Sequence, residues 1–413
     1  MSSNETSPES SDAPQSDPLQ RFEEAHSFWQ NDFFDACNKG LLSKQDLAFV
    51  FEQYYLYSKN FTRYLSGLMA NLEDDLLRSR LSENLWEEGG EKEPHLRHAQ
   101  IFRNFLEDGL QIDIAKIKYL PATQHFVEQY LANCIQGSAL HSSAFLSLGT
   151  EGIVSRMYTI LVKGMLSAGI EEKHLEFFRI HIGCDDEHAA TLTDILNSYQ
   201  HLPEWDRLAR KGLDLSLRLR RDFFNEMMRE VRRRRVDGHL DRIQQKQSLL
   251  TKDVGSEQLS FAPAIKNDTS IYHNKIEAMN IDFTVDRAPF PAEVIDARVV
   301  RIHAGRNNER HKHAHETVFY ILEGHGQVII DDRAIPVQKG DCVFVPRWAV
   351  HQSQNKSDGE MMILAVTDFH LTGKAFLGDY EATARKKRAP QQKSAPQQES
   401  AAEPQERSTE EPA

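Results

Sequence analysis

The chain has 413 residues, of which 40% are hydrophobic and 27% charged, and its net charge at pH 7 is −13. This length allows two ordinary domains, and the composition is that of a soluble globular protein. The acidic balance argues against nucleic acid as a partner, and the lack of an apolar run of about 18 residues argues against a membrane span. The N-terminal residues have no apolar core, so we expect no signal peptide. Four cysteines without CxxC spacing predict reduced thiols in a cytoplasmic protein.

The two ends of the chain have the composition of disordered segments. Residues 1–18 are rich in Ser, Pro and acidic residues, and residues 379–413 are of low complexity. A basic run, residues 232–235, closes a helical stretch that carries further arginines. We interpret this stretch as a solvated helix end, because cations favour a helix C-terminus. The further arginines are Arg218, Arg220, Arg221 and Arg229.

Between the two ends, the spacing of apolar residues changes once, from helical to strand-like. Over 19–240 apolar residues recur at three- and four-residue steps, which predicts an all-α bundle of seven or eight helices. The pattern weakens over 241–285, which we interpret as a linker. Over 286–378 short β-rich runs alternate with turn signals, which predicts a small β-barrel.

The β half contains a histidine pair in a regular setting. Gly305 and five intervening residues precede His311 and His313, and Gly324 follows a strand later. Residues two apart on a strand point to the same face, so both imidazoles should aim into one barrel interior.

A second group of residues lies further along the β half. Five residues separate Gly340 from Pro346, and His351 and Asn355 follow. We expect His351 to supply a third nitrogen from a neighbouring strand. Three imidazoles with open positions are typical of a site for a divalent transition metal.

These residues resemble the two signature motifs of the cupin family, G-x5-HxH-x3,4-E-x6-G and G-x5-PxG-x2-H-x3-N. Thr317 stands where the family often has a ligand Glu, and Glu316 is one residue out of phase. The resemblance therefore implies a three-histidine metal site. His315 is an even number of residues from His311 and His313, so its side chain could point to the same face and make a fourth contact with the metal. It could equally lie behind the ligands. Trp348 replaces the second motif's Gly and should narrow the mouth.

The helical half contains a second candidate metal site. Spacings of four and seven residues place His181, Asp185 and His188 within about 60° of one helix face. Burying such a face is unfavourable unless a cation is bound there. Polar residues also interrupt the apolar pattern upstream, and with the first three they make six candidate ligands. The upstream residues are Glu88, His98 and Glu151, with Glu87 and His95 as alternatives to the first two.

A bundle that projects Glu and His inward from several helices has the layout of di-iron carboxylate proteins. In order along the chain, the six residues resemble the pattern E…H…E…H-x3-D-x2-H of the haem-oxygenase-like di-iron oxidases. These oxidases share a fold with the thiaminase II and pyrroloquinoline-quinone synthase families. The resemblance implies two Fe(II) ions in the helical domain and O2 as co-substrate.

The fusion of this bundle to a cupin resembles the streptozotocin-forming N-nitrosating enzyme and related N-oxygenases. That resemblance implies that the helical domain oxidises a nitrogen of an amino-acid-derived amine or guanidine. A third Fe(II) in the cupin would then process the product. Cupins and the bundle family both tend to form dimers, so these resemblances imply a homodimer. An external electron donor is left open. An extra carboxylate of that group has no counterpart at the expected separation, where Tyr54, Tyr55 and Tyr64 occur instead.

Two other functions stay open from the sequence. The first is oxidative C–C cleavage or decarboxylation of an amino or fatty acid. The second is a non-catalytic cupin that binds or senses a metabolite. An acidic substrate would need a cation in the helical cavity, for which Arg156 and Lys163 are candidates.

Overall fold

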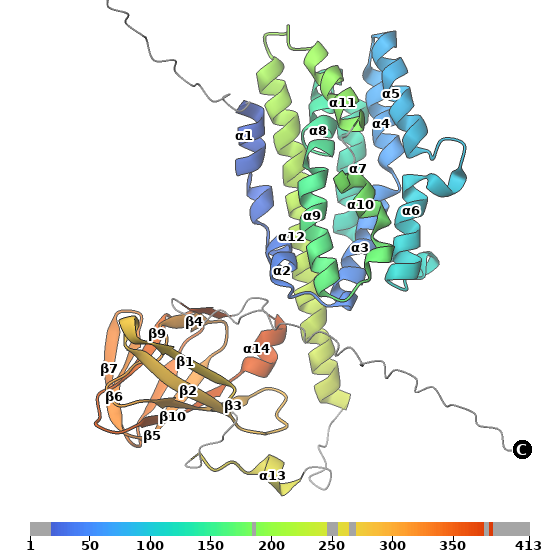
Figure 1. Ribbon diagram of the computed structural model, residues 1–413. Coiled ribbons are helices and arrows are strands. Elements are labelled where there is room, and N and C mark those ends of the chain that lie inside the picture. Colours follow the sequence, from blue (N-terminus) through green and yellow to red (C-terminus); the bar gives the residue numbers. More distant parts are fainter. Residues whose placement is uncertain (1–17, 184–186, 246–254, 264–269, 376–379, 383–413) are drawn as a thin grey trace, which may run out of the picture. The chain divides into compact units, whose positions relative to one another are not determined.

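The computed structural model describes residues 18–183, 187–245, 255–263, 270–375 and 380–382. The chain divides into two compact units. The first contains the chain up to residue 259 together with 290–296 and 368–379, and the second contains the remainder. The first unit is helical and the second is a β-structure (Figure 1), which confirms the predicted fold class. The predicted disordered ends lie outside the described residues, except that Pro18 begins a helix and residues 380–382 form a strand.

The helical unit is cut into more pieces than the seven or eight helices that the sequence predicts. Between residues 18 and 245 the described chain has twelve α-helices, several of them short. Local capping interactions set where the helices begin and end. Asn31 accepts a hydrogen bond from Phe34 N at the start of α2, and Gly40, with φ +64°, ends α2. The helices are α1 Pro18–Ala25, α2 Asp32–Lys39, α3 Lys44–Ser58, α4 Phe61–Asn71, α5 Asp75–Glu88, α6 His98–Asn104, α7 Pro121–Gln136, α8 Ala139–Ser147, α9 Val154–Ser167, α10 Glu176–Gly183, α11 Glu187–Ser198 and α12 Trp205–Gln245. Two further helices are α13 Ser256–Leu259 and α14 Phe369–Ala375.

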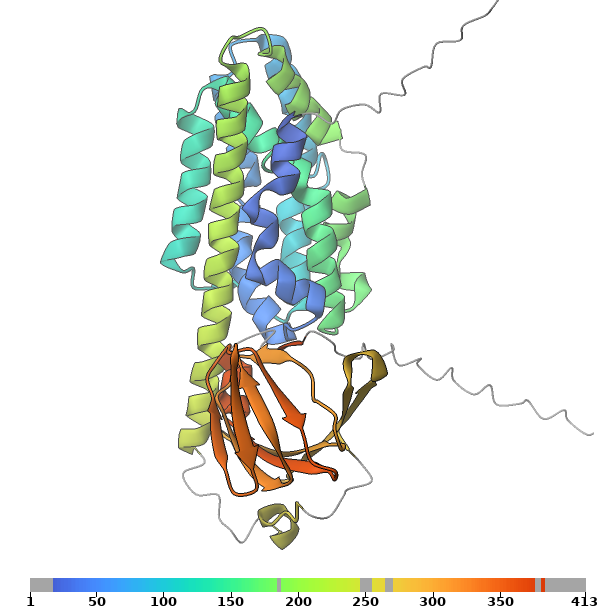
Figure 2. The same cartoon turned by 90° about the vertical axis from the view of Figure 1, so that its left-hand side faces the viewer.

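Helix α12 runs the length of the bundle (Figure 2). The basic run at residues 232–235 lies inside this helix instead of at its end, so the interpretation as a solvated helix end was wrong. Arg235 donates from Nε to Asp46 Oδ1 over 3.1 Å, and Asp46 also closes the capping box that begins α3. Arg220 is buried with 1% of its surface exposed. Helix α12 thus carries buried cationic contacts as well as a solvated face.

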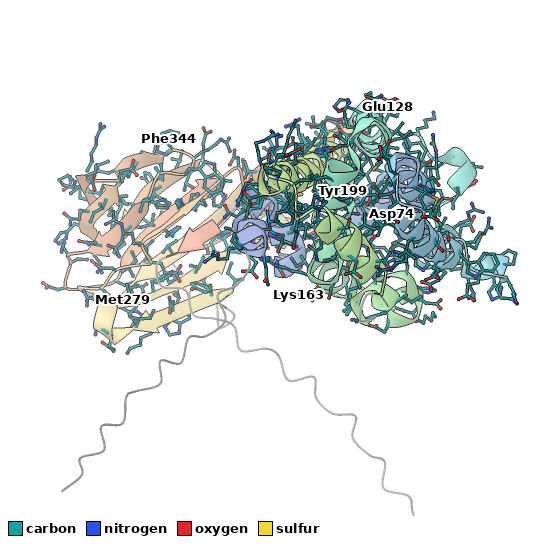
Figure 3. The ribbon with its side chains drawn as sticks, turned by 90° about the horizontal axis from the view of Figure 1, so that it is seen from above. Asp74, Glu128, Lys163, Tyr199, Met279 and Phe344 are labelled. Atoms are coloured by element: carbon teal, nitrogen blue, oxygen red, sulfur yellow. The ribbon has the colours of Figure 1, made fainter. Side chains whose placement is uncertain are left out.

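The core of the bundle is rich in aromatic side chains. Phe51, Phe102, Phe105 and Phe178 pack edge to face with ring centroids 5.0–6.4 Å apart. The outer surface carries polar side chains such as Lys163, labelled in Figure 3. Among the described residues, no helix has both the length and the apolar composition needed to cross a membrane.

The second unit is an antiparallel β-structure of two sheets. The strand order is β1-β2-β3-β10-β5-β8 in one sheet and β11-β4-β9-β6-β7 in the other. The core between the sheets includes Ile302, Ile321 and Val345. The strands are β1 Tyr272–Ile276, β2 Ile281–Arg287, β3 Asp296–Ile302, β4 His311–His313, β5 Thr317–Glu323, β6 His325–Ile330, β7 Arg333–Gln338, β8 Cys342–Val345, β9 His351–Asn355, β10 Met361–Thr367 and β11 Tyr380–Ala382.

The segment 241–285 differs from the linker that the sequence predicts. It contains the end of α12, helix α13, strand β1 and most of β2. Strand β1 buries only Asn274, and β2 buries Asp282 and Asp286 among its apolar residues. Strand β1 therefore shows no apolar alternation, and its pairing with β2 defines it. Strand β2 does alternate apolar Ile281, Phe283 and Val285 with polar residues, so its signal was present in the sequence and was missed.

Candidate metal centres

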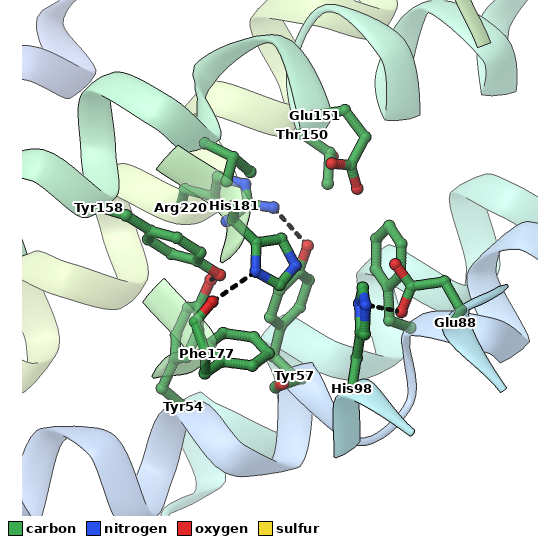
Figure 4. Close-up of a pocket in the computed structure, with 13 residues that line it drawn as sticks. Tyr54, Tyr57, Glu88, His98, Thr150, Glu151, Tyr158, Phe177, His181 and Arg220 are labelled. Carbon is green, nitrogen blue, oxygen red and sulfur yellow. Dashed lines mark hydrogen bonds and ion pairs between the residues drawn. The ribbon is translucent and has the colours of Figure 1, made fainter. Parts of the chain in front are cut away.

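Three of the predicted ligands meet inside the helical bundle. Glu88, His98 and His181 each offer a donor atom, and these atoms lie within 4.8 Å of one another (Figure 4). Glu88 ends α5, His98 begins α6, and His181 lies in the last turn of α10. A carboxylate and two imidazoles brought together from three helices can bind one divalent transition metal.

The turn between α5 and α6 brings the first two of these side chains together. Gly90 has φ +78°, and a Cβ added there would lie 2.5 Å from Arg97 N and 2.7 Å from Glu93 O. Only glycine fits such a position. The Gly89-Gly90 pair therefore ends the helix and reverses the chain, so that His98 lies beside Glu88.

An ion-pair contact and one hydrogen bond hold the rings of the cluster. His98 Nδ1 lies 2.9 Å from Glu88 Oε2, and the rings of His98 and His181 are 4.9 Å apart. His181 Nδ1 lies 2.6 Å from the carbonyl oxygen of Phe177. A carbonyl oxygen only accepts hydrogen bonds, so His181 Nδ1 carries the hydrogen and Nε2 presents its lone pair.

The structure distinguishes the residues that competed for the same positions. Glu88 has 5% of its surface exposed, whereas Glu87 is only half-buried. The side chain of His95 is 71% exposed and lies 3.7 Å from Glu93, whereas His98 lines the cavity. The geometry therefore places Glu88 and His98 at the centre.

The structure describes the other three predicted ligands to different extents. Glu151, in the 3-10 helix η5 (Glu151–Ile153), is buried and lines the same cavity without joining the three-residue group. Asp185 lies outside the described residues. His188 is described only as part of the backbone of α11.

Most of the side chains that line the cavity around the cluster are polar. Of the tyrosines that the sequence places early in the bundle, Tyr54 lines it, and its hydroxyl lies 3.3 Å from that of Tyr158. Tyr55 instead accepts hydrogen bonds from Arg103, and Tyr64 donates to the Tyr57 carbonyl. One tyrosine of the three therefore faces the cluster.

Sequence reasoning missed Arg220, which lines this cavity. The signal was present, because Arg220 interrupts an apolar stripe at helical spacing on α12, between Leu217 and Phe224. The two cations proposed for the cavity lie elsewhere. Arg156 stacks on Trp29 at 3.8 Å and is half exposed, and Lys163 is exposed beside Asn38.

The β-structure brings a second cluster together from two strands. His311 on β4 pairs directly with His351 on β9, and His313 follows on the same face of β4. The donor atoms of the three histidines lie within 4.8 Å of one another. Their ring centroids are 4.2 Å apart for His311–His351, 4.7 Å for His313–His351 and 5.3 Å for His311–His313.

Each of these rings is held by a backbone carbonyl. His311 Nδ1 donates to Glu309 O at 3.0 Å, His313 Nδ1 to His315 O at 2.9 Å and His351 Nδ1 to Ala349 O at 2.9 Å. The carbonyls fix the tautomer, so all three Nε2 atoms present lone pairs, as metal-binding histidines do. His351 Nε2 is buried and has no hydrogen-bond partner among the described residues. The donor set therefore fits a divalent transition metal.

Burial also keeps these histidines neutral. Loss of solvation lowers the pKa of His313 to about 3 and holds the pKa of His311 well below its usual range. The pKa of His351 is lowered for the same reason. A neutral imidazole is the form that binds metal, so no proton has to be displaced at neutral pH.

His315 and the residues at which the chain differs from the cupin motifs lie at different places around the three histidines. The ring of His315 stacks on that of His313 at 3.6 Å, and its carbonyl orients His313, so it lies behind the ligands. Thr317 is buried, and Glu316 is exposed beside Arg347. Trp348 keeps φ +59°, the backbone conformation for which the motif has glycine.

Two families match the chain. Residues 48–221 match the family described as an iron-containing redox enzyme, and residues 298–367 match the cupin domain. The helical part is 24% identical over 173 residues to a 4-aminobenzoate synthase from Chlamydia pneumoniae, covering 41% of this chain and 75% of that protein. A gentisate 1,2-dioxygenase from a Streptomyces species is 32% identical over 72 residues, covering 17% of this chain. The chain spans only 20% of that dioxygenase.

Solved structures resemble the β unit. A cupin 2 barrel protein from Rhodopseudomonas palustris has 26% identity and a TM-score of 0.22, covering 24% of this chain and 68% of that one. A salicylate 1,2-dioxygenase from Pseudoaminobacter salicylatoxidans has 18% identity and a TM-score of 0.23, covering 25% of this chain and 32% of that one. The two family matches by themselves show a haem-oxygenase-like domain of the iron-containing redox enzymes at residues 48–221 and a cupin domain at residues 298–367.

Proposed function

We propose that the helical domain binds two iron ions and uses O2 to oxidise a nitrogen of an amino-acid-derived amine or guanidine. We further propose that the cupin binds one metal ion and processes the product. The observation that carries the proposal is the meeting of Glu88, His98 and His181 in a tyrosine-lined cavity of an iron-containing redox enzyme domain.

The donor chemistry of the cavity supports iron. Glu88 and Glu151 supply carboxylate oxygens, and His98 and His181 supply imidazole nitrogens. With Asp185 and His188 the set would reach three carboxylates and three imidazoles, which is the composition of di-iron sites in helical bundles. Iron bound there supplies the activation of O2 and accepts the change of valence.

The residues of the chain itself position the reactants. The Phe177 carbonyl fixes the His181 tautomer, and Glu88 lies within hydrogen-bonding distance of His98. Tyr54 and Tyr158 line the cavity with hydroxyls that can orient a polar substrate. Burial raises the pKa of Tyr158 well above its usual range, so its hydroxyl stays protonated.

The lining of the cavity favours a small polar substrate over a fatty acid. Most of the side chains that line it are polar or charged, whereas a long alkyl chain needs an extended apolar channel. The Chlamydia pneumoniae relative is named for 4-aminobenzoate, a small carboxylate that bears an amine. That name supports a nitrogen-bearing small molecule as the substrate here.

The proposal is tested by loading the full chain with Fe(II) under anaerobic conditions and then admitting O2 in the presence of amino acids and guanidines. We expect about three irons per chain and products hydroxylated on nitrogen, identified by mass spectrometry. Loss of CO2 or a shortened carbon chain would instead establish oxidative C–C cleavage. No oxidation together with tight binding of a metabolite would establish a binding protein.

Variants separate the two domains in the same assay. Replacing His181 by alanine should abolish O2 consumption and remove the helical iron while the cupin keeps its metal. Replacing His311 and His313 together should leave O2 consumption intact and let the nitrogen-hydroxylated intermediate accumulate. An unchanged final product from that double variant would show that the cupin does not act on the product.

A further inference from the structure

A fully buried arginine lies in the wall of the helical cavity. Arg220 has 1% of its surface exposed and lines the same cavity as Glu88, His98 and His181 (Figure 4). Its Nε donates to the Tyr130 hydroxyl over 2.7 Å, and its Nη2 donates to the Tyr57 hydroxyl. Its Nη1 is buried and has no hydrogen-bond partner among the described residues.

The tyrosines hold this guanidinium without neutralising it. The guanidinium carbon lies 4.7 Å from the centroid of the Tyr57 ring and 5.3 Å from that of Tyr130. Burial holds the pKa of Tyr57 well above its usual range, so the phenol is a neutral acceptor and not a counter-ion. No carboxylate of the described residues forms an ion pair with Arg220.

A buried arginine keeps its charge, and burying a charge is unfavourable unless an opposite charge compensates for it. Metal ions at the neighbouring cluster would add positive charge. Two divalent cations would outweigh the carboxylates of Glu88 and Glu151, which line the cavity, so the loaded cavity would be positive even before Arg220 is counted. An anion in the cavity would balance it.

The free donors of Arg220 have the geometry for one particular class of anion. A guanidinium has five N–H groups, and the tyrosines engage one on Nε and one on Nη2. Both hydrogens of Nη1 are without an acceptor among the described residues. A carboxylate oxygen can accept a charge-assisted hydrogen bond from Nη1, and guanidinium–carboxylate pairs favour a two-pronged geometry.

We propose that Arg220 binds the carboxylate of the substrate, and that the substrates of the helical domain are therefore small amino acids instead of simple amines or guanidines. The inference rests on the proposed function, which it deepens by naming the substrate class. Tyr57 and Tyr130 act as positioning residues that hold the guanidinium fork toward the substrate carboxylate.

The first test needs no substitution. Matched pairs of probes that differ in a carboxylate, namely L-arginine with agmatine, L-lysine with cadaverine and L-tyrosine with tyramine, are presented anaerobically to the iron-loaded full chain. Equilibrium dialysis gives the dissociation constants. At least one amino acid should bind roughly 10- to 100-fold more tightly than its partner amine, as expected for a charge-assisted pair of hydrogen bonds. Equal binding within every pair overturns the inference.

The second test assigns the preference to Arg220. In Arg220→Gln the ratio between the two members of the preferred pair should fall to about one, while iron uptake stays as in the wild type. Arg221→Gln is the control, since Arg221 is on the same helix and pairs with Asp222 at the surface. It should keep the full ratio. A ratio that persists in Arg220→Gln overturns the assignment.

The outcome stays interpretable if Arg220→Gln fails to fold, which circular dichroism would reveal. Arg220→Lys then replaces it, because lysine keeps the charge but lacks the fork, and the ratio should fall without disappearing. Failure of the inference also differs from failure of the proposed function. Nitrogen oxidation of amino acids and amines alike would contradict only the inference. Arg220-dependent binding without any oxidation would contradict only the proposed function.

Discussion

His311 and His351 lie directly opposite each other on strands β4 and β9, with their ring centroids 4.2 Å apart. A partly buried and a buried imidazole in a cross-strand pair add little to the stability of a sheet, and their desolvation opposes protonation of either ring. The backbone carbonyls at Glu309 and Ala349 aim both Nε2 atoms at the same point. The pair is therefore arranged for a metal ion and not for sheet packing.

Substitution of His351 by alanine should remove the cupin metal and leave the helical iron in place. Loss of a direct ligand should weaken metal affinity by more than the roughly 10- to 100-fold that loss of an orienting partner costs. Metal analysis of the full chain should show about one metal ion fewer per chain. His325→Ala is the control, because His325 is exposed on β6. Unchanged metal content in His351→Ala would contradict the three-histidine site.

Glu88→Gln should abolish iron binding in the helical domain, whereas Glu87→Gln should not. The two residues are neighbours in α5, but only Glu88 places its carboxylate in the cavity. Glutamine keeps the size of the side chain and loses the charge that a metal cation needs. Iron content should fall by about two per chain in Glu88→Gln. Equal loss in the two variants would show that the effect comes from the helix and not from the ligand.

Trp348→Gly should be more stable than Trp348→Ala, although alanine is usually the better tolerated residue. Trp348 has φ +59°, and this conformation costs a residue with a Cβ about 1–2 kcal/mol. The greater freedom of glycine in the unfolded chain offsets about 0.4–1 kcal/mol of that. Chemical denaturation of the full chain should therefore favour glycine over alanine by about 0.5–1 kcal/mol. The reverse order would show that no strain resides at this position.

Alkylation with iodoacetamide at pH 8 should modify Cys342 and spare Cys37. Cys342 is exposed, whereas Cys37 is buried and burial raises its pKa to about 12. Because the thiolate is the reactive form, only about one Cys37 thiol in 10,000 would be ionised at pH 8. Peptide mapping should find Cys37 modified only after denaturation. Rapid modification of Cys37 in the folded protein would contradict its burial.

The sequence could predict the fold class because the periodicity changes once along the chain. Apolar residues at helical spacing need only local geometry to form an amphipathic face, and the HxH pair needs only the alternation of a strand to share one side. The motif around His311, His313 and His351 could therefore be identified from the spacing of its residues alone. Strand β1 could not, because its only buried residue is the polar Asn274 and pairing with β2 defines it.

The choice between neighbours in the helical site also depended on the tertiary structure. Both Glu87 and Glu88 precede the glycine pair, and the spacing cannot determine which one turns inward. The turn at Gly90, closed against Arg97 and Glu93, sets the direction of α6 and so brings His98 to Glu88.

The sequence by itself determined the two-part architecture and the kinds of donor that each part offers, because local periodicity and motif spacing are properties of the chain. Only the tertiary structure decided that Glu88 and His98 meet His181, and that Arg220 lies in their cavity under Tyr57 and Tyr130. These contacts join residues that are far apart along the chain. Their distances depend on how helices pack, which no local pattern records.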